Sequence, residues 1–539
     1  MSGSNVQPSP QPPQPQKVPV QLKTHDHVRI DPYFWMNDRE NPAVLQHLHD
    51  ENAYVDAMMA HAKGFEESLF EEIKGRIKQT DLSVPFKLDD YFYYTRFEEG
   101  KEYPIFCRKK LSLDNPEEIM LDVNVLAEGH EYYAVGACTV SFNQDILAYA
   151  FDSQGRRIYT IRFKNLITGE VYEDEIPDVT GNMAWANDNR TLLYSRQDPT
   201  TLRSHQIKRH SLGHPPEDDH LVFQEEDETF SVYVIKTKSK RFLMIASQQT
   251  VSSEYQYVDA NTPFHEFKVF LSRERDHEYD MDHFGDAFYI RTNDHAKNFR
   301  LMKTSIDQPD RQHWQEVIPH RSDVLLESFE LFNEFYVLEE RKEGLINLRV
   351  ISWDGDTDYH LDFGEPTYLA SLGENPEFHT TTLRYIYTSM TTPTTVYDYD
   401  MQTRAKTFLK QEEVLGEFNS ANYQTDRVWA TAPDGTSIPI SLVSRKGFER
   451  NGEAPLLLYG YGSYGASMDA SFSSPRLSLL DRGFMFALAH IRGGEEMGRY
   501  WYEDGKLLNK KNTFTDFIAC AEFLLQEQYT KTEKLFAMG

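Results

Sequence analysis

Residues 456–498 read LLLYGYGSYGASMDASFSSPRLSLLDRGFMFALAHIRGGEEMG and contain two continuous apolar runs, Leu456–Tyr459 and Phe484–Ala489. Glycine-rich turns follow both runs, and uninterrupted apolar runs are typical of strands buried on both faces of a parallel sheet. Downstream, apolar residues recur at helical spacing from Thr513, and Leu535–Met538 is a further apolar run. This alternation of strand and helix predicts an α/β domain.

A hairpin is predicted just upstream of that stretch. Val428–Ala432 and Ser437–Val443 flank Asp434-Gly435, a dipeptide favoured in tight β-turns. We therefore begin the α/β domain near residue 418 and assign residues 418–539 to it.

The middle of the chain has a different texture, in which short aromatic and β-branched runs alternate with turn residues. VSFNQDILAY at residues 140–149 resembles MAWANDNRTLLY at residues 183–194, with a spacing of 45 positions between matching leucines and tyrosines. Such a period suits four-stranded propeller blades. Residues 80–417 have room for seven or eight blades, and a pair of β-sandwiches is the structural alternative.

The N-terminal region divides into two segments. Residues 1–18 are rich in proline and glutamine and predict a disordered tail. Residues 19–79 predict a helical segment, because Asn41 precedes Pro42 at a helix start and apolar residues follow at helical spacing. This segment needs another domain to pack against.

The charge balance restricts the partners. The chain has 56 basic and 85 acidic side chains, a net charge of −29, and residues 418–539 contribute almost none of it. An acidic surface repels phosphate backbones, so we expect no nucleic-acid or anionic-membrane binding and an attraction for basic peptides. The 3 cysteines are too few for a disulfide framework. They fit a reducing compartment, and we expect a cytoplasmic location.

The glycine cluster Tyr459–Gly465 is the first candidate for chemistry. It does not fit a phosphate-binding loop, and the nucleophile pattern G-x-S-x-G fails because Tyr461 precedes Ser463 by two positions. A loop that stabilises an oxyanion and a plain tight turn both remain, and the residues by themselves favour the tight turn. The second candidate is the charged glycine loop at residues 492–498, for which an active-site wall and a solvated loop are both open. No metal site or cofactor is implied.

Long stretches resemble a known family. RIDPYFWMNDRENPAVLQHL at residues 29–48, LRYIYTSMTTP at residues 383–393 and the whole of residues 456–539 resemble the prolyl oligopeptidase family, and within it the oligopeptidase B group. The resemblance implies a seven-bladed β-propeller lid over 80–417. It also implies an incomplete α/β-hydrolase domain over 418–539, on which the helical segment 19–79 packs. Its members are serine peptidases, and oligopeptidase B cuts short peptides after arginine or lysine.

The resemblance also implies roles for single residues. Tyr461 matches the tyrosine whose hydroxyl donates to the oxyanion, and Asp469 matches an acid that holds a second basic side chain of the substrate. Ser471 stands where the companion acid is expected, which puts a preference for paired basic residues in doubt. Arg492, Gly493, Gly494 and Glu496 match an active-site loop, in which Glu495 replaces a glycine and is expected to stiffen or displace the loop.

In the family, a segment similar to LFAMG at residues 535–539 is followed directly by the nucleophile elbow. The resemblance therefore implies that the serine, acid and histidine of the triad lie beyond residue 539, that the chain is a truncated fragment and that it is inactive alone. Two alternatives are a non-catalytic propeller module that binds basic peptides, and one half of a split enzyme completed by a second polypeptide.

Overall fold

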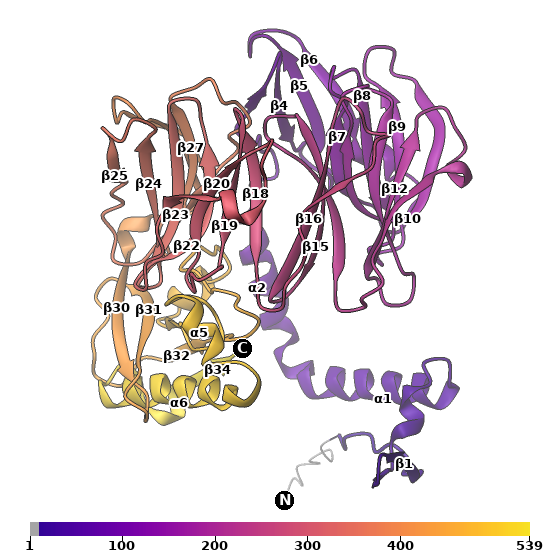
Figure 1. Ribbon diagram of the computed structural model, residues 1–539. Helices are drawn as coiled ribbons and strands as arrows, with labels where there is room; N and C mark the ends of the chain where they lie inside the picture. Colours follow the sequence, from indigo (N-terminus) through magenta and orange to yellow (C-terminus); the bar gives the residue numbers. More distant parts are fainter. Residues whose placement is uncertain (1–9) are drawn as a thin grey trace, which may run out of the picture. The chain divides into compact units, whose positions relative to one another are not determined.

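The computed structural model describes residues 10–539, and the chain divides between Ile77 and Lys78 into two compact units (Figure 1). Residues 1–9 of the predicted disordered tail lie outside the described residues. In the first unit, β1 (Val20–Thr24) and β2 (His27–Asp31) form an antiparallel hairpin that the sequence analysis did not predict. The helices of this unit are η1 (Phe34–Asn37), α1 (Pro42–Met59), η2 (Ala60–Ala62) and α2 (Lys63–Lys74).

Helix α1 starts where the sequence places a start signal. The Asn41 side chain accepts a hydrogen bond from the Ala43 amide at 3.0 Å, and Pro42 occupies the first helical turn, where its missing N–H costs nothing. The packing of this unit on the hydrolase domain stays a prediction.

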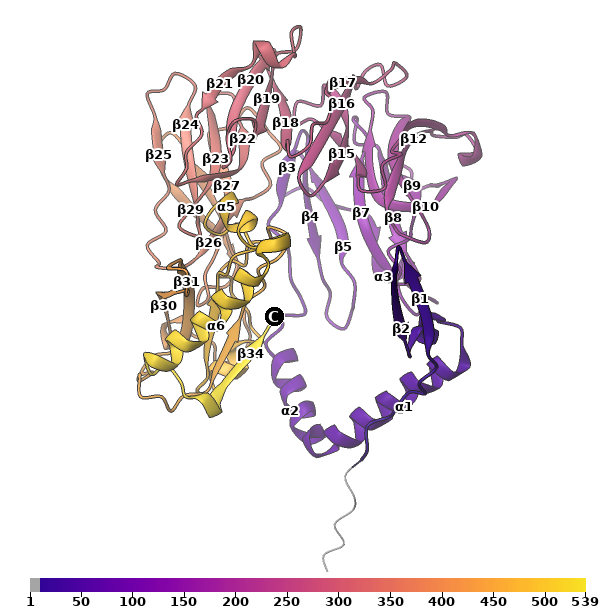
Figure 2. The same ribbon diagram turned by 60° about the horizontal axis from the view of Figure 1, so that its bottom comes forward.

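The second unit begins with antiparallel sheets whose strands follow chain order (Figures 1 and 2). We call β3–β29 the propeller part. Five of its sheets are four-stranded. They consist of β3 (Phe86–Leu88), β4 (Tyr91–Arg96), β5 (Ile105–Lys110) and β6 (Glu117–Asp122); β14 (Ser231–Lys236), β15 (Phe242–Gln249), β16 (Ser252–Asp259) and β17 (Lys268–Leu271); β18 (Tyr279–Phe284), β19 (Ala287–Thr292), β20 (Arg300–Ser305) and β21 (Gln315–Ile318); β22 (Leu325–Leu331), β23 (Phe335–Lys342), β24 (Leu345–Ser352) and β25 (Asp358–His360); and β26 (Leu369–Leu372), β27 (Thr382–Thr388), β28 (Thr395–Asp400) and β29 (Lys406–Gln411).

The prediction of seven blades is wrong, because the remaining strands form one seven-stranded sheet. Its central strand β10 is 15 residues long and pairs with β9 through its first part and with β11 through its last part. Register shifts in the pairing of β10 with β9 and with β11 accommodate the change of partner along this long strand, so the seven strands form one continuous sheet. The sheet consists of β7 (Ala134–Val140), β8 (Ile146–Asp152), β9 (Tyr159–Asn165), β10 (Val171–Trp185), β11 (Thr191–Gln197), β12 (Ser204–Ser211) and β13 (His220–Gln224).

Successive sheets pack face to face through apolar side chains. Leu193 and Ile207 of the seven-stranded sheet share a buried cluster with Val232 and Leu243 of the next sheet. The last sheet contacts the first through side chains: Arg384 donates to the Pro85 carbonyl at 2.7 Å. Among the described residues no strand pairs across that junction. Short helices in loops of this part are α3 (Val123–Leu126), η3 (Pro216–Asp218) and η4 (Arg311–His313).

The hydrolase part, β30–β34 with its helices, confirms the predicted α/β alternation. Its sheet has the order β30-β31-β33-β32-β34, in which β33, β32 and β34 are parallel. Helix α6 covers one face with Ala519, Cys520 and Leu524 (Figure 2), while Leu477 and Leu480 of α4 pack on the other. The elements are η5 (Ser420–Asn422), β30 (Tyr423–Thr431), β31 (Ser437–Arg445), β32 (Leu456–Tyr459), α4 (Leu477–Leu480), β33 (Met485–Ala489), α5 (Arg499–Glu503), η6 (Leu507–Asn509), α6 (Lys511–Gln526), η7 (Thr532–Lys534) and β34 (Leu535–Met538).

Candidate active site

The glycine cluster forms a loop that follows the carboxyl end of β32 and contacts the start of α6 in space. Gly462 has φ +61°, and a Cβ there would lie 2.6 Å from the Thr513 methyl group. Its carbonyl accepts a hydrogen bond from the Lys510 ammonium, which stands at the N-terminus of α6. The loop therefore needs glycine to approach the helix this closely.

Tyr461 lies on the rim of a groove at this edge. The groove has a volume of about 380 Å³ and is lined by Tyr461, Thr513, Phe514, Met538 and Gly539, among others. Tyr461 is 40% exposed. Loops after the carboxyl ends of parallel strands are where α/β sheets bind ligands, and Tyr461 lies in the loop that follows β32.

Arg492 faces inward and holds the second loop together. Its guanidinium donates to both carboxylate oxygens of Asp516 on α6, at 2.8 and 2.6 Å, and to Asp434 in the β30–β31 turn at 2.7 Å. The hydrogen bond from Arg492 is the main cause that lowers the pKa of Asp434 to about 2. Arg492 and Asp516 are both buried, so this predicted site residue positions the loop and does not face the groove.

The two glycines after Arg492 are required by close contacts. Gly493 has φ +109°, and a Cβ there would lie 2.0 Å from the Gly462 carbonyl oxygen. A Cβ at Gly494 would lie 2.1 Å from Oε2 of Glu496. The two predicted loops therefore touch backbone to backbone, and the Gly465 amide donates to the Gly493 carbonyl at 2.9 Å.

Glu496 is buried behind the loop and does not reach the groove surface. It is 1% exposed, and its Oε1 accepts the Met468 amide at 2.9 Å. Its Oε2 has no hydrogen-bond partner within residues 10–539. Burial is the main cause that raises the pKa of Glu496 to about 7.

Asp469 is paired with an arginine that the sequence analysis did not identify. Arg341, on β23 of the propeller part, donates to Asp469 Oδ1 at 2.6 Å and Oδ2 at 3.2 Å. Arg341 is 3% exposed and also pairs with Glu327. Both oxygens of Asp469 are thus engaged across the junction between the propeller and hydrolase parts. Ser471, two residues further along the chain, is uncharged and does not offer a second carboxylate beside Asp469.

A second arginine links the same two parts. Arg499 on α5 pairs with Glu495 of the glycine loop and with Glu278 of the propeller part. Glu495 replaces a glycine of the family pattern, and the structure shows that its carboxylate anchors the loop through Arg499. Burial is the main cause that raises the pKa of Glu278 to about 7. The Arg341–Asp469 and Arg499–Glu278 pairs had no local sequence signal, since the two partners of each pair are distant in the chain.

The structure contains one serine–histidine pair in the hydrolase part, and it is not placed for catalysis. Ser441 Oγ lies 2.8 Å from His490 Nε2, and both side chains are buried. Burial lowers the pKa of His490 to about 3, which makes the imidazole a weak base. Ser441 also lies 2.8 Å from the Thr367 hydroxyl of the propeller part, so the pair ties the two parts together.

A propeller of antiparallel sheets joined to an α/β sheet, with a glycine loop at its carboxyl edge, defines a propeller-bearing member of the α/β-hydrolase class. The prolyl oligopeptidase N-terminal β-propeller domain matches residues 12–412, and the prolyl oligopeptidase family domain matches residues 470–539. The chain belongs to the prolyl oligopeptidase family. That family consists of serine peptidases, which places the chain among the peptide hydrolases.

The chain is similar along almost its whole length to characterised relatives. It is 46% identical to dipeptidyl aminopeptidase BI of Pseudoxanthomonas mexicana, over 98% of this chain and 75% of that protein. It is 34% identical to protease 2 of Moraxella lacunata, over 97% of this chain and 76% of that protein. The structure of oligopeptidase B from Leishmania major matches with a TM-score of 0.92 and 34% identity, over 98% of this chain and 78% of that one.

Within residues 10–539, no group of three or more histidine, cysteine or acidic side chains is arranged to hold a metal ion. None of the helices in this range combines the length and apolar character that crossing a membrane requires.

Proposed function

We propose that this chain supplies the propeller and the oxyanion-binding portion of a serine oligopeptidase that cleaves short peptides after arginine or lysine. The observation that carries the proposal is the position of Tyr461, half-exposed on a groove at the carboxyl edge of β32 and β34. The relatives of known structure include oligopeptidase B from Trypanosoma brucei with covalently bound antipain, at 33% identity and a TM-score of 0.91.

In this proposal the Tyr461 hydroxyl donates a hydrogen bond to the oxygen that becomes negative in the tetrahedral intermediate. A donor held in place before the reaction stabilises the transition state more than the substrate, and one such donor contributes about 3–4 kcal/mol. The loop is suited to hold the tyrosine, because Gly462 and Gly493 lock it against α6 and the neighbouring loop.

The nucleophile is proposed to come from outside these 539 residues. Ser463, the serine beside Tyr461, contacts the Lys510 ammonium at 3.3 Å, and no histidine is paired with it among the described residues. Ser441 has a histidine partner but is buried. The chain alone is therefore inactive in this proposal, and a continuing segment or a second polypeptide supplies the serine, the acid and the histidine.

The preference for basic peptides rests on charge and on the relatives. The net charge of −29 belongs almost entirely to the residues before 418, so the propeller part generates a field that attracts cationic peptides. Binding that depends on this field weakens as salt screens it, with a Debye length of about 8 Å at physiological ionic strength.

The test uses the purified 539-residue chain and two labelled peptides that differ only in arginine or the isosteric, neutral citrulline. We expect salt-sensitive binding of the arginine peptide, at least tenfold tighter than the citrulline peptide, and no hydrolysis of an arginyl amide substrate. Equal binding of the two peptides overturns the basic preference. If the chain alone hydrolyses the arginyl amide but not a leucyl amide, the proposal that the nucleophile comes from outside these residues is wrong. Binding without hydrolysis, even when the remaining hydrolase segment is added, favours a non-catalytic peptide-binding module.

A second candidate activity is the release of dipeptides from a free N-terminus. It is favoured by the 46% identity to dipeptidyl aminopeptidase BI, which exceeds the 34% identity to protease 2. The two activities separate when the completed enzyme is assayed on one peptide with a free and with an acetylated N-terminus. An oligopeptidase cleaves both, whereas a dipeptidyl aminopeptidase cleaves only the free form.

A further inference from the structure

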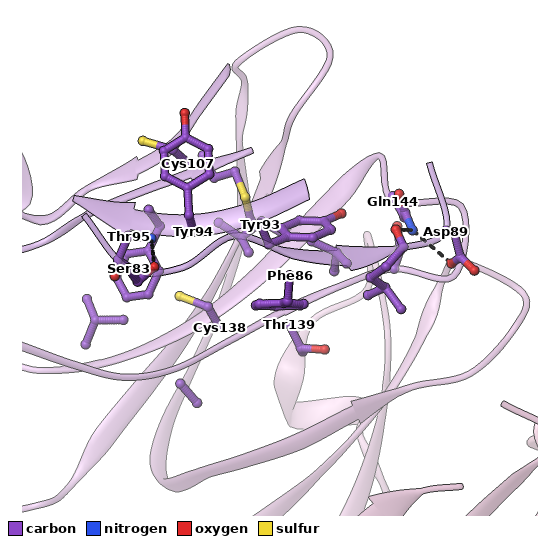
Figure 3. Close-up of a pocket in the computed structure, with 18 of the residues that line it drawn as sticks. Ser83, Phe86, Asp89, Tyr93, Tyr94, Thr95, Cys107, Cys138, Thr139 and Gln144 are labelled. Atoms are coloured by element: carbon purple, nitrogen blue, oxygen red, sulfur yellow. Dashed lines mark hydrogen bonds between the residues drawn. The ribbon is translucent and has the colours of Figure 1, made fainter. Parts of the chain in front are cut away.

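A cavity of about 550 Å³ lies between the first sheet of the propeller part and strand β7 (Figure 3). Interiors of proteins are close-packed and rarely leave voids much larger than a water molecule. This volume instead falls within the range of small-molecule sites, roughly 300–1,000 Å³. The cavity therefore needs an explanation beyond imperfect packing between two sheets.

The body of the cavity is apolar and aromatic. Phe86 on β3 stacks on Tyr93 of β4 with ring centres 5.8 Å apart and an angle of 25° between planes. Phe106 on β5 and Cys138 on β7 also line the space, and Figure 3 shows Phe86, Tyr93 and Cys138 around it. Phe86, Tyr93 and Phe106 sit on paired strands of one sheet, and Cys138 sits on a strand of the neighbouring sheet. The walls are therefore preformed and favour a compact apolar group.

A buried polar side chain along the wall is only partly satisfied. Gln144 is 4% exposed; its Nε2 donates to Asp89 at 2.9 Å, while its Oε1 has no hydrogen-bond partner within residues 10–539. An unsatisfied buried acceptor or donor costs about 1–3 kcal/mol. A ligand that carries an N–H or O–H group would satisfy the Gln144 oxygen.

The mouth of the cavity presents a cation without a counter-ion. Lys236 and Lys240 reach it from the end of β14 and the following turn. Lys240 pairs with Asp89, whereas Lys236 pairs with no carboxylate among residues 10–539 and lies 5.3 Å from the centre of the Phe142 ring. Burial is the main cause that lowers the pKa of Lys236 to about 8; Lys240 lowers it further, and Asp188 and Asp89 oppose the shift.

We propose that this cavity binds a small amphipathic carboxylate. The apolar body fills the space beside Phe86, Tyr93 and Phe106, and the carboxylate pairs with Lys236 at the mouth. An anionic group there supplies the missing counter-ion, and an amide N–H on the ligand reaches the free oxygen of Gln144. The chemistry is shared by two sources, a medium-chain fatty acid and the free carboxyl end of a short apolar peptide.

The test is equilibrium binding to the folded 539-residue chain, measured by calorimetry at pH 7 with decanoate and with the peptide acetyl-Phe-Leu. We expect saturable binding of at least one, and at least tenfold weaker binding in Lys236→Met, which removes the charge but keeps an apolar stem. Lys268→Met, an exposed lysine on β17, is the matched control and should bind as the wild type does. Cys138→Phe should abolish binding by filling the cavity. Tighter binding of the peptide assigns the source to peptides with an N–H group, and tighter binding of decanoate assigns it to fatty acids.

The head group is tested with decanol, which has the same chain and no charge. Decanol should bind at least tenfold more weakly than decanoate to the wild type, and equally to the wild type and to Lys236→Met. Decanoate affinity should also fall as Lys236 deprotonates between pH 8 and 10. The proposal is overturned if neither carboxylate binds the wild type, or if Lys236→Met, shown to be folded by circular dichroism, binds decanoate as tightly as the Lys268→Met control.

Discussion

Replacement of Arg341 by methionine tests whether the buried guanidinium holds the propeller and hydrolase parts together. Arg341 joins Glu327 of its own sheet to Asp469 of the hydrolase part. Methionine keeps an unbranched stem of similar length and removes the charge. The variant therefore leaves two carboxylates facing each other without the cation between them.

The magnitude follows from the burial of the three groups. Breaking a buried ion pair by removing one partner costs about 3–5 kcal/mol, because the remaining charge is left uncompensated. Arg341 is almost fully buried, but the side chains of Asp469 and Glu327 are 21% and 25% exposed, so water partly solvates both carboxylates after the change. We therefore expect a loss near the lower limit, about 3 kcal/mol in the free energy of unfolding.

The assay is urea unfolding of the full chain, followed by hydrogen exchange of residues 341–345 and 466–470. The matched control is Arg162→Met, because Arg162 pairs with Glu175 on the adjacent strand and both side chains are exposed, at 37% and 50%. An exposed pair contributes about 0–1 kcal/mol. The double variant Arg341→Met with Asp469→Asn should recover part of the loss. If Arg341→Met is no more destabilised than Arg162→Met, and exchange at the junction is unchanged, the reasoning is refuted.

Three further predictions concern the hydrolase part. The pKa of Glu496 is raised to about 7 in the folded chain, so its protonated form contributes stability that is fully present below about pH 4.5 and is lost as the pH rises through 7. Glu496→Gln should remove this loss, which is measured by comparing thermal melts of the two proteins at pH 5 and pH 8. An equal change of melting temperature with pH in both proteins would count against the prediction. Gly493→Ala should destabilise the loop by more than about 1–3 kcal/mol, because strain at φ +109° adds to a 2.0 Å contact with Gly462; a melting temperature equal to that of the wild type contradicts this. In the completed enzyme, Tyr461→Phe should lower kcat by about 10²–10³ with little change in KM; an unchanged kcat rules out the oxyanion role.

The hydrolase strands could be predicted because their signals are local. β32, β33 and β34 are continuous apolar runs, glycine-rich turns follow β32 and β33, and Asp434-Gly435 fixes the β30–β31 hairpin. The blade count could not be predicted in the same way. The 45-residue repeat is real and places Leu147 in β8 and Leu192 in β11, but it does not show where one sheet ends. That depends on backbone pairing along β10, which continues through both halves of the repeat.

The site could be predicted residue by residue, but not the contacts of each residue. The pattern of glycines at 460–465 and 493–494 identified two loops that do touch. The same pattern gave no indication that Arg492 turns inward to Asp516, because an arginine beside glycines reads equally as a surface residue. Arg341 was missed because it is 128 positions from Asp469 and stands in an ordinary strand.

The pairing of Asp469 changes what the resemblance predicts for substrate preference. A second basic side chain that binds Asp469 competes with the Arg341 guanidinium, which already donates to both carboxylate oxygens at 2.6 and 3.2 Å. If that competition drew Asp469 away, Arg341 would keep only Glu327 as a carboxylate partner, and a buried cation that loses one of two carboxylates is destabilised. Ser471 independently lacks the carboxylate that would help a second basic side chain compete. Within the proposed function, both observations favour recognition of single rather than paired basic residues, while Asp469 joins the hydrolase part to Arg341 of the propeller part.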